Sequence, residues 1–263
     1  AGNIAAREGD LPSARGFHER ALAVFRERGD RLGVAYLLHN LGVMTALEGE
    51  FGRALALYEE SLSVSRALGE LRLAGLTLVN IGDAALGVCQ TDRARDAVEE
   101  ALAIARRQEV ATLEAGALVN RASLLCAEGD LDGAERDAAA SLALARSVGY
   151  SELFATIFDT LALVALRTGD LAGAARSCAE GLECAAEAGD RNDVALLLLR
   201  GGQIAAKRGD VDEAARMLRE SLGLSVGLGV RRGVAECVEG LAAVALARGR
   251  VARAARLVGA AEA

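Results

Sequence analysis

The feature that most constrains the fold of this chain is an alanine that recurs every forty residues. Its seven copies are Ala14, Ala54, Ala94, Ala134, Ala174, Ala214 and Ala254. A second small residue precedes each alanine by twelve positions, namely Gly2, Gly42, Gly82, Ala122, Ala162, Gly202 and Ala242. A long fixed period of this kind indicates one supersecondary unit that is stacked repeatedly. We therefore predict a single repeat array over residues 1–263.

Each repeat is predicted to contain two helices separated by short turns. A glycine recurs about every twenty residues and is often followed by an acidic residue, as in Gly49-Glu50 and Gly129-Asp130. Glycine ends a helix by adopting the left-handed conformation, and the acidic side chain caps the next helix. Two turns lack the glycine. At one of them Thr91 or Asp92 is expected to be the cap, and the other, at Gln108-Glu109, is expected to be the least sharply defined.

The apolar residues between the turns follow helical spacing, and no segment alternates long enough to indicate a strand. The small residues are expected where the two helices of a pair cross, because short side chains allow helix axes to approach within about 8–10 Å. Leucines are expected to fill the space between adjacent repeats, at positions 22, 62, 102, 142, 182 and 222. The sequence therefore predicts an all-α solenoid of antiparallel helix pairs, with about 6.5 repeats over 263 residues.

Composition excludes several classes of protein. The net charge of −7 and pI near 5.1 argue against a nucleic-acid-binding domain. No apolar run approaches the roughly 20 residues that cross a membrane. The five cysteines show no CxxC spacing and the chain has only two histidines, so no metal site and no cofactor are expected, and a reducing cytoplasmic setting is favoured. Because phosphate-binding loops and nucleophile elbows are also missing from the sequence, we do not expect an enzyme.

The repeat resembles the tetratricopeptide repeat (TPR) family, in which a small residue on the first helix precedes an alanine, an aromatic and another small residue on the second. The matching residues are Leu38, Leu41, Gly42, Ala54, Tyr58 and Ser61. The usual tryptophan and helix-ending proline are absent, and the aromatic position is weaker in the other repeats. The resemblance implies a right-handed superhelix. Because the period exceeds the usual 34 residues, HEAT or armadillo arrays are the alternative.

The last segment, residues 252–263, is similar to a short sequence motif near the end of the repeat region in large actinobacterial regulators. In these proteins a nucleotide-binding domain usually precedes the repeats, and a LuxR-type helix-turn-helix domain often follows. The resemblance implies that the chain is a segment of a longer regulator. No P-loop and no helix-turn-helix motif occur in the segment itself.

In TPR arrays the first helix of each repeat lines the concave face, and this places a candidate binding groove. Asn40, Asn80 and Asn120 recur at forty-residue intervals, and an amide can both donate to and accept from a peptide main chain. Further along, Arg200 stands at the same position in a predicted basic pocket for a carboxylate, followed by an acidic end at Glu236 and Glu239. The full candidate set is Tyr36, His39, Asn40, Asn80, Asp83, Asn120, Asp159, Arg167, Arg200, Gln203 and Lys207. His39 alone is more typical of a packing or surface residue than of a ligand.

These observations favour a non-catalytic module that binds a protein segment, a peptide or a small effector within a bacterial cytoplasmic regulator. The partner could be a flanking domain of the same chain, whereas nucleic acid and membrane are not expected. The alternative is a scaffold that self-associates into homo-oligomers through exposed terminal repeats, since such repeats normally need a polar cap.

Overall fold

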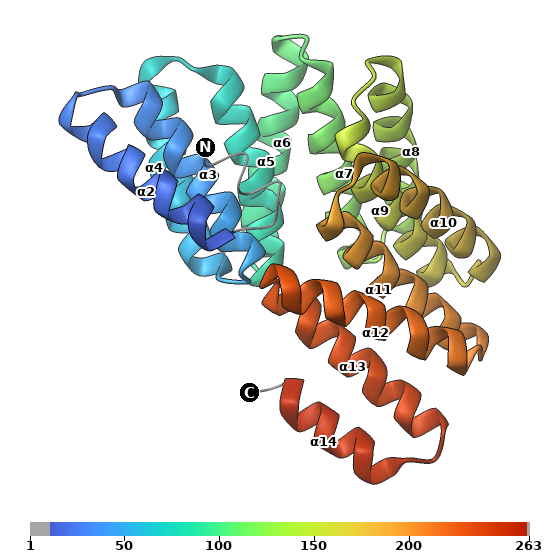
Figure 1. Cartoon of the computed structure of the whole chain (residues 1–263). Helices are drawn as coiled ribbons and strands as arrows, with labels where there is room; N and C mark the ends of the chain where they lie inside the picture. The colour runs from blue at the N-terminus through green and yellow to red at the C-terminus, as the bar shows by residue number, and fades with distance from the viewer. Residues whose placement is uncertain (1–10, 262–263) are drawn as a thin grey trace. The chain divides into compact units, whose positions relative to one another are not determined.

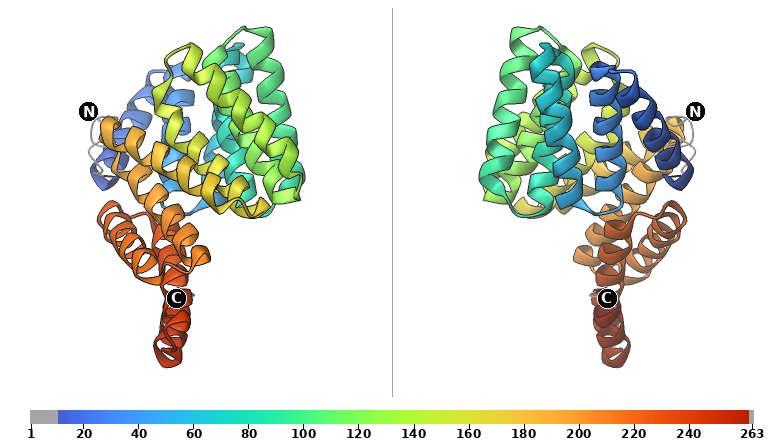
Figure 2. Two further views of the ribbon diagram at one scale, coloured as in Figure 1. Left: turned by 90° about the vertical axis from the view of Figure 1, so that its right-hand side faces the viewer. Right: turned by 90° about the vertical axis from the view of Figure 1, so that its left-hand side faces the viewer.

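The computed structural model describes residues 11–261, and every regular element in this range is a helix. Contacts divide the chain into two compact units, Ala1–Tyr150 (unit 1) and Ser151–Ala263 (unit 2). In each unit, consecutive helices pack against one another and are joined by turns of two or three residues (Figures 1 and 2). The all-α solenoid class predicted from the sequence is confirmed. Gly2 and the Gly9-Asp10 turn lie outside the described residues.

Unit 1 contains seven described helices, which are α2 (Leu11–Glu27), α3 (Arg31–Leu47), α4 (Phe51–Leu68), α5 (Leu71–Gly87), α6 (Thr91–Arg107), α7 (Ala111–Glu128) and α8 (Leu131–Ser147). Unit 2 begins with the short 3-10 helix η1 (Ser151–Leu153) and continues with α9 (Phe154–Thr168), α10 (Leu171–Ala188), α11 (Arg191–Arg208), α12 (Val211–Leu228), α13 (Arg231–Ala247) and α14 (Val251–Ala261).

Odd-numbered and even-numbered helices form two different layers in each unit. Helix α5 contacts both α3 and α7, and α11 contacts both α9 and α13, whereas no comparable contacts join even-numbered helices among the described elements. Helices that lie closer together occupy the smaller radius of a curved stack. The odd-numbered helices therefore line the inner face of each unit and the even-numbered helices its outer face.

The turns depend on one left-handed residue each. Glycine occupies this position in ten of the turns, with φ between 67° and 93°. Cys89 (φ 58°) and Glu109 (φ 53°) adopt the same conformation in the two turns that lack glycine. The prediction that the Gln108-Glu109 turn is poorly defined is wrong, because the amide of Val110 donates to Ala105 O at 3.0 Å, as in the glycine-containing turns.

Aspartate caps several helices as the sequence predicts. The side chains of Asp30, Asp130 and Asp170 each accept a hydrogen bond from a backbone amide three residues later, at 2.8–2.9 Å. The expectation for the turn before α6 is wrong: Gln90 occupies the N-cap position, and α6 already begins at Thr91. A cap residue must precede the first helical residue, so neither Thr91 nor Asp92 can fill that role.

The predicted small-residue crossing is present in the described repeats. A Cβ atom added to Gly42 would lie 2.4 Å from the ring of Tyr58, and one added to Gly202 would lie 2.6 Å from Leu218 Cγ. Ala54 and Ala214 on the facing helices are fully buried. The ring or branched side chain therefore occupies the space that the missing methyl group leaves. Burial of Tyr58 also raises the pKa of its hydroxyl, with the charge of Asp83 as a smaller contribution.

A serine three residues after the aromatic position joins the helices of three pairs. Ser61, Ser141 and Ser221 are buried and donate to backbone carbonyl oxygens of the preceding helix at 2.6–2.8 Å. The acceptors are the carbonyls of Ala35, Ala115 and Ala195. Of the six predicted inter-repeat leucines, Leu22, Leu62 and Leu102 are buried and the other three are partly buried.

Candidate functional site

The asparagines on the inner face of unit 1 connect adjacent repeats. Asn120 Nδ2 on α7 donates to the carbonyl oxygen of Val79 on α5 at 2.7 Å. Asn80 Nδ2 on α5 lies 3.4 Å from His39 Nε2 on α3. Both contacts reach back 41 residues, to the helix one repeat earlier. One N–H of each of these two amides is therefore directed to the preceding repeat, and the second N–H and Oδ1 take no part in these contacts.

His39 lies at the centre of a hydrogen-bond network between α3 and α5. Thr77 Oγ1 donates its only proton to Leu73 O at 2.8 Å, so it must accept from His39 Nδ1 at 3.1 Å. His39 Nε2 is then the free acceptor for the Asn80 amide. Burial lowers the pKa of His39 to about 4, so the ring is neutral at physiological pH. His39 is thus a packing residue.

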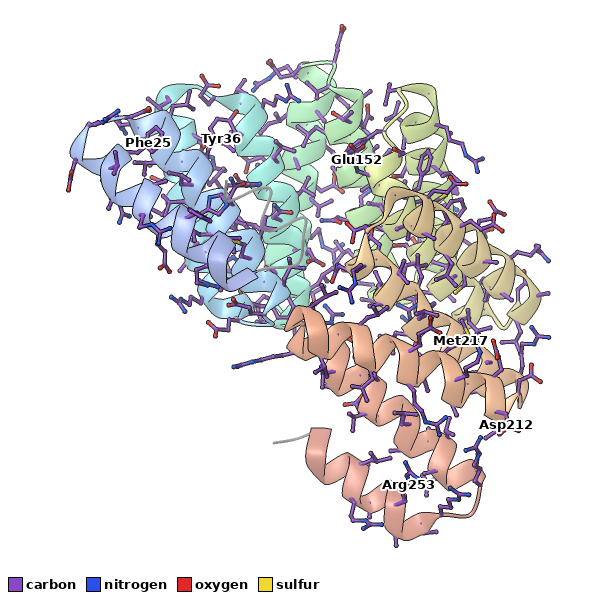
Figure 3. The ribbon with its side chains drawn as sticks, in the orientation of Figure 1. Phe25, Tyr36, Glu152, Asp212, Met217 and Arg253 are labelled. Carbon is purple, nitrogen blue, oxygen red and sulfur yellow. The ribbon has the colours of Figure 1, made fainter. Side chains whose placement is uncertain are left out.

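Two large apolar side chains are exposed on the same inner face. Tyr36 on α3 is 44% exposed, and Leu76 occupies the position forty residues later on α5 and is 36% exposed. Tyr36 is labelled in Figure 3. Asn40 lies one turn after Tyr36 on the same side of α3, and Asp83 is exposed on α5. Leu76 was not among the residues predicted from the sequence, although its forty-residue spacing from Tyr36 identifies it.

The inner face of unit 2 contains a partly buried ion pair. Arg200 on α11 donates to both carboxylate oxygens of Asp159 on α9, at 2.8 and 3.0 Å, and each side chain is only 14% exposed. Another guanidinium nitrogen of Arg200 donates to Gln203 Oε1 at 2.9 Å. The two-pronged contact expected for a bound carboxylate is therefore made by Asp159. Arg200, at the centre of the predicted basic pocket, is thus neutralised by Asp159 within the chain.

Other titratable groups surround this pair. Asp193 on α11 has a pKa raised to about 7, mainly by burial and further by Asp190 and Asp159. Burial lowers the pKa of Arg200, but the charge of Asp159, the hydrogen bond to Asp159 and the charge of Glu236 together raise it by more, so Arg200 remains charged. Burial raises the pKa of Cys178 to about 11, and its thiol donates to Leu197 O at 3.2 Å. A thiol in this state is protonated and unreactive.

The remaining candidates in unit 2 are on the surface. Lys207 and Arg167 are exposed near the ends of α11 and α9. Glu236 is partly buried on α13, and Gly240 occupies the position equivalent to Arg200. The acidic groups nearest the Arg200–Asp159 pair are therefore Asp193 and Glu236, whereas Lys207 and Arg167 lie on the exposed surface.

The outer face of unit 1 contains a groove of about 560 Å³ between α4 and α6. Leu78 and Ile81 of α5 contribute to its lining. Two ion pairs connect its walls: Arg66 with Glu100 at 2.6 Å, and Arg93 with Glu59. Because each arginine faces a glutamate, this groove has little net charge to attract an ionic ligand.

Within the residues that the structure describes, no group of three or more potential metal ligands occurs. No helix between residues 11 and 261 is long and apolar enough to span a membrane.

A protein-family model described as "Tetratricopeptide repeat" matches residues 1–67, about a quarter of the chain. No curated protein matches the sequence. Among solved structures, the Rap conjugation gene regulator of plasmid pLS20 in complex with the Phr* peptide is similar over 99% of this chain and 70% of its own, with a TM-score of 0.79 and 15% identity. BtubC from P. vanneervenii is similar over 81% of this chain and 89% of its own, with a TM-score of 0.61 and 22% identity.

A third similar structure is the signal transduction ATPase PH0952 from Pyrococcus horikoshii, described as having a tetratricopeptide repeat sensor. It matches 95% of this chain and 43% of its own length, with a TM-score of 0.60 and 12% identity. At these identities the likeness concerns the fold, which is that of TPR-containing solenoids.

Proposed function

We propose that the chain is a non-catalytic binding module that holds a peptide or protein segment on the inner face of unit 1. The observation that carries this proposal is the exposure of Tyr36 and Leu76 at equivalent positions of α3 and α5. Apolar side chains that recur on neighbouring helices of one face can together form a contiguous contact surface for a partner. Tyrosine in particular is enriched among residues that dominate binding energy.

Polar groups beside these side chains suit a peptide main chain. Asn40 makes no hydrogen bond within the described residues, so its amide can donate and accept together. Asn120 uses only Nδ2, which leaves Oδ1 as an acceptor for a peptide N–H. The ligand that fits is an extended segment whose apolar side chains contact Tyr36 and Leu76. Because Arg200 is already paired with Asp159, we do not include it in the proposed binding surface.

The similar structures agree with this class of ligand. The pLS20 regulator was solved with the Phr* peptide, and another Rap protein was solved with the competence and sporulation factor. Residues 252–263 resemble the end of the repeat region in large actinobacterial regulators. Together with these peptide-bound structures, this resemblance leads us to assign the chain to a bacterial cytoplasmic signalling or transcriptional regulator. Peptide binding would be transmitted to flanking domains through the stacked repeats.

The proposal is tested by selecting peptides from a random library with the intact chain and measuring their affinity for variants. Tyr36→Ala and Leu76→Ser should each weaken binding about tenfold or more, as expected for central apolar contacts. Val24→Ser is the matched control, because Val24 is equally exposed in unit 1 but lies on the outer-layer helix α2. Equal affinity for Tyr36→Ala, Leu76→Ser and the control would refute the proposed surface.

The alternative, a self-associating scaffold, is favoured by a separate observation in unit 2. Four apolar residues on α12, α13 and α14 are 45–66% exposed, namely Val226, Leu246, Val251 and Val258. If they form an interface between copies, sedimentation should show a mass that increases with concentration, and Leu246→Ser should return the chain to a monomer. A single monomeric species at all concentrations would exclude this alternative.

A further inference from the structure

The last three helices of unit 2 line a small, half-open pocket to which four arginines contribute, three of them exposed. Its volume is about 40 Å³, and its polar lining is supplied by Arg219 on α12, Arg248 at the end of α13, and Arg250 and Arg253 at the start of α14. The rest of the lining is apolar, consisting of Leu241, Val244, Ala245 and Leu257. Arg253 is labelled in Figure 3. This is a locally cationic site on a chain whose net charge is −7.

The pocket is the counterpart, four repeats later, of the groove between α4 and α6. Equivalent positions four repeats apart differ by 160 residues. Arg219 is therefore equivalent to Glu59 of that groove, and Arg253 is equivalent to Arg93. In unit 1 the glutamate and arginine form an ion pair. In unit 2 the same two positions carry like charges.

The charges in this pocket are only partly compensated. Arg248 forms an ion pair with Asp212, whose side chain is 98% exposed. Arg219, Arg250 and Arg253 have no ion-pair partner among the side chains of residues 14–259 that the structure describes. Like charges that line one pocket repel each other unless an anion lies between them.

The N-terminus of α14 also lacks a compensating negative charge. The residue before the first helical residue is Asp130 and Asp170 in earlier repeats, where the carboxylate caps the helix. Here it is Arg250, and the first turn of α14 contains no acidic residue. The positive end of this helix therefore lacks the negative charge that the earlier repeats supply from their own side chains.

We infer that this arginine pocket binds the phosphoryl group of a phosphomonoester. Arginine contacts the oxygen atoms of phosphate with two parallel hydrogen bonds, and several arginines can share a single dianion. A volume of about 40 Å³ has space for roughly three water molecules, which suits one oxyanion group. The apolar lining from Leu241, Val244 and Leu257 favours an organic substituent on the phosphate.

The direct test is calorimetric titration of the intact chain with phenyl phosphate and with inorganic phosphate, at constant ionic strength in chloride. Phenyl phosphate should bind more tightly than inorganic phosphate because its ring contacts the apolar lining, and benzoate, with a single charge, should bind more weakly than phenyl phosphate. Arg219→Glu restores the charge pattern of Glu59 and Arg93, so it should weaken phenyl phosphate binding about tenfold or more while the chain stays folded.

Arg231→Glu is the matched control, because Arg231 is exposed on α13 and does not line the pocket, yet the change in net charge is the same. It should leave binding unchanged. Arg253→Glu provides a second variant from the opposite wall and should behave like Arg219→Glu. If phenyl phosphate does not bind, or if Arg219→Glu and Arg231→Glu bind it equally, the inference is overturned.

Discussion

Arg200 and Asp159 form a two-pronged ion pair between α11 and α9, 41 residues apart in the sequence, with both side chains 14% exposed. Asn80 and Asn120 occupy equivalent positions in unit 1 and make contacts of the same 41-residue span. The position that the sequence analysis assigned to ligand binding therefore joins one inner-face helix to the preceding one. The side chain at this position is an amide in Asn80 and Asn120 and a guanidinium in Arg200. The acceptor is correspondingly a neutral group in unit 1 and the carboxylate of Asp159 in unit 2.

Asp159→Ala should destabilise unit 2 by about 3 kcal/mol, because it leaves the partly buried Arg200 without a counter-charge. Replacing both residues with apolar side chains should cost less than the single substitution. Urea unfolding of the two single variants and the double variant measures this coupling. Glu213→Ala, which removes an exposed partner of Arg216, should change stability little. Equal effects of Asp159→Ala and Glu213→Ala would show that the inner-face pair has no special role.

His39 should make stability depend on pH. Its pKa is about 4 in the folded chain and 6.5 in the unfolded chain, so the unfolded state binds more protons between these values. Its contribution is thus fully present above pH 6.5 and is lost as the pH falls to 4, by up to about 3 kcal/mol. The difference in unfolding free energy between the original chain and His39→Gln, measured from pH 7.5 to 4, should decrease through this window. A difference that is constant with pH would contradict the buried, neutral histidine.

Cys89→Gly and Glu109→Gly should each stabilise the chain by about 0.5–1 kcal/mol. Both residues hold a left-handed conformation that costs an ordinary residue roughly 1–2 kcal/mol, and glycine relieves most of this cost. Gly129→Ala, the reverse change at an equivalent turn, should destabilise the chain. Thermal unfolding of the three variants checks the signs. Loss of stability in both glycine variants would contradict this account of the turns.

Ala134→Leu should destabilise the chain by about 1–3 kcal/mol, because the alanine is fully buried at a helix crossing and a larger side chain would overpack the core. Ala139→Leu is the control, since Ala139 is exposed on the same helix, α8. An unchanged melting temperature for Ala134→Leu would contradict the small-residue packing.

The sequence predicted the fold well because a forty-residue period carries information about both helices of a pair and their crossing. Gly42 against Tyr58 and Gly202 against Leu218 could be located from spacing alone. Spacing says less about the hydrogen bonds of the inner face. Spacing places Arg200 and Asn120 on the correct face, but it does not show that their hydrogen-bond donors turn toward the preceding repeat. Residue preference also did not indicate that Cys89 and Glu109 would adopt the left-handed conformation, which side chains other than glycine rarely take.

Whether a peptide binds the inner face of unit 1 can be measured by hydrogen exchange of the intact chain with and without a library-selected peptide. We expect slower exchange in α3 and α5, around Tyr36 and Leu76, and little change in the outer helices α2 and α4. Tyr36→Ala should abolish this protection at the same peptide concentration. Protection confined to α4 and α6, or to α12–α14, would show that the peptide binds elsewhere and refute the proposed surface.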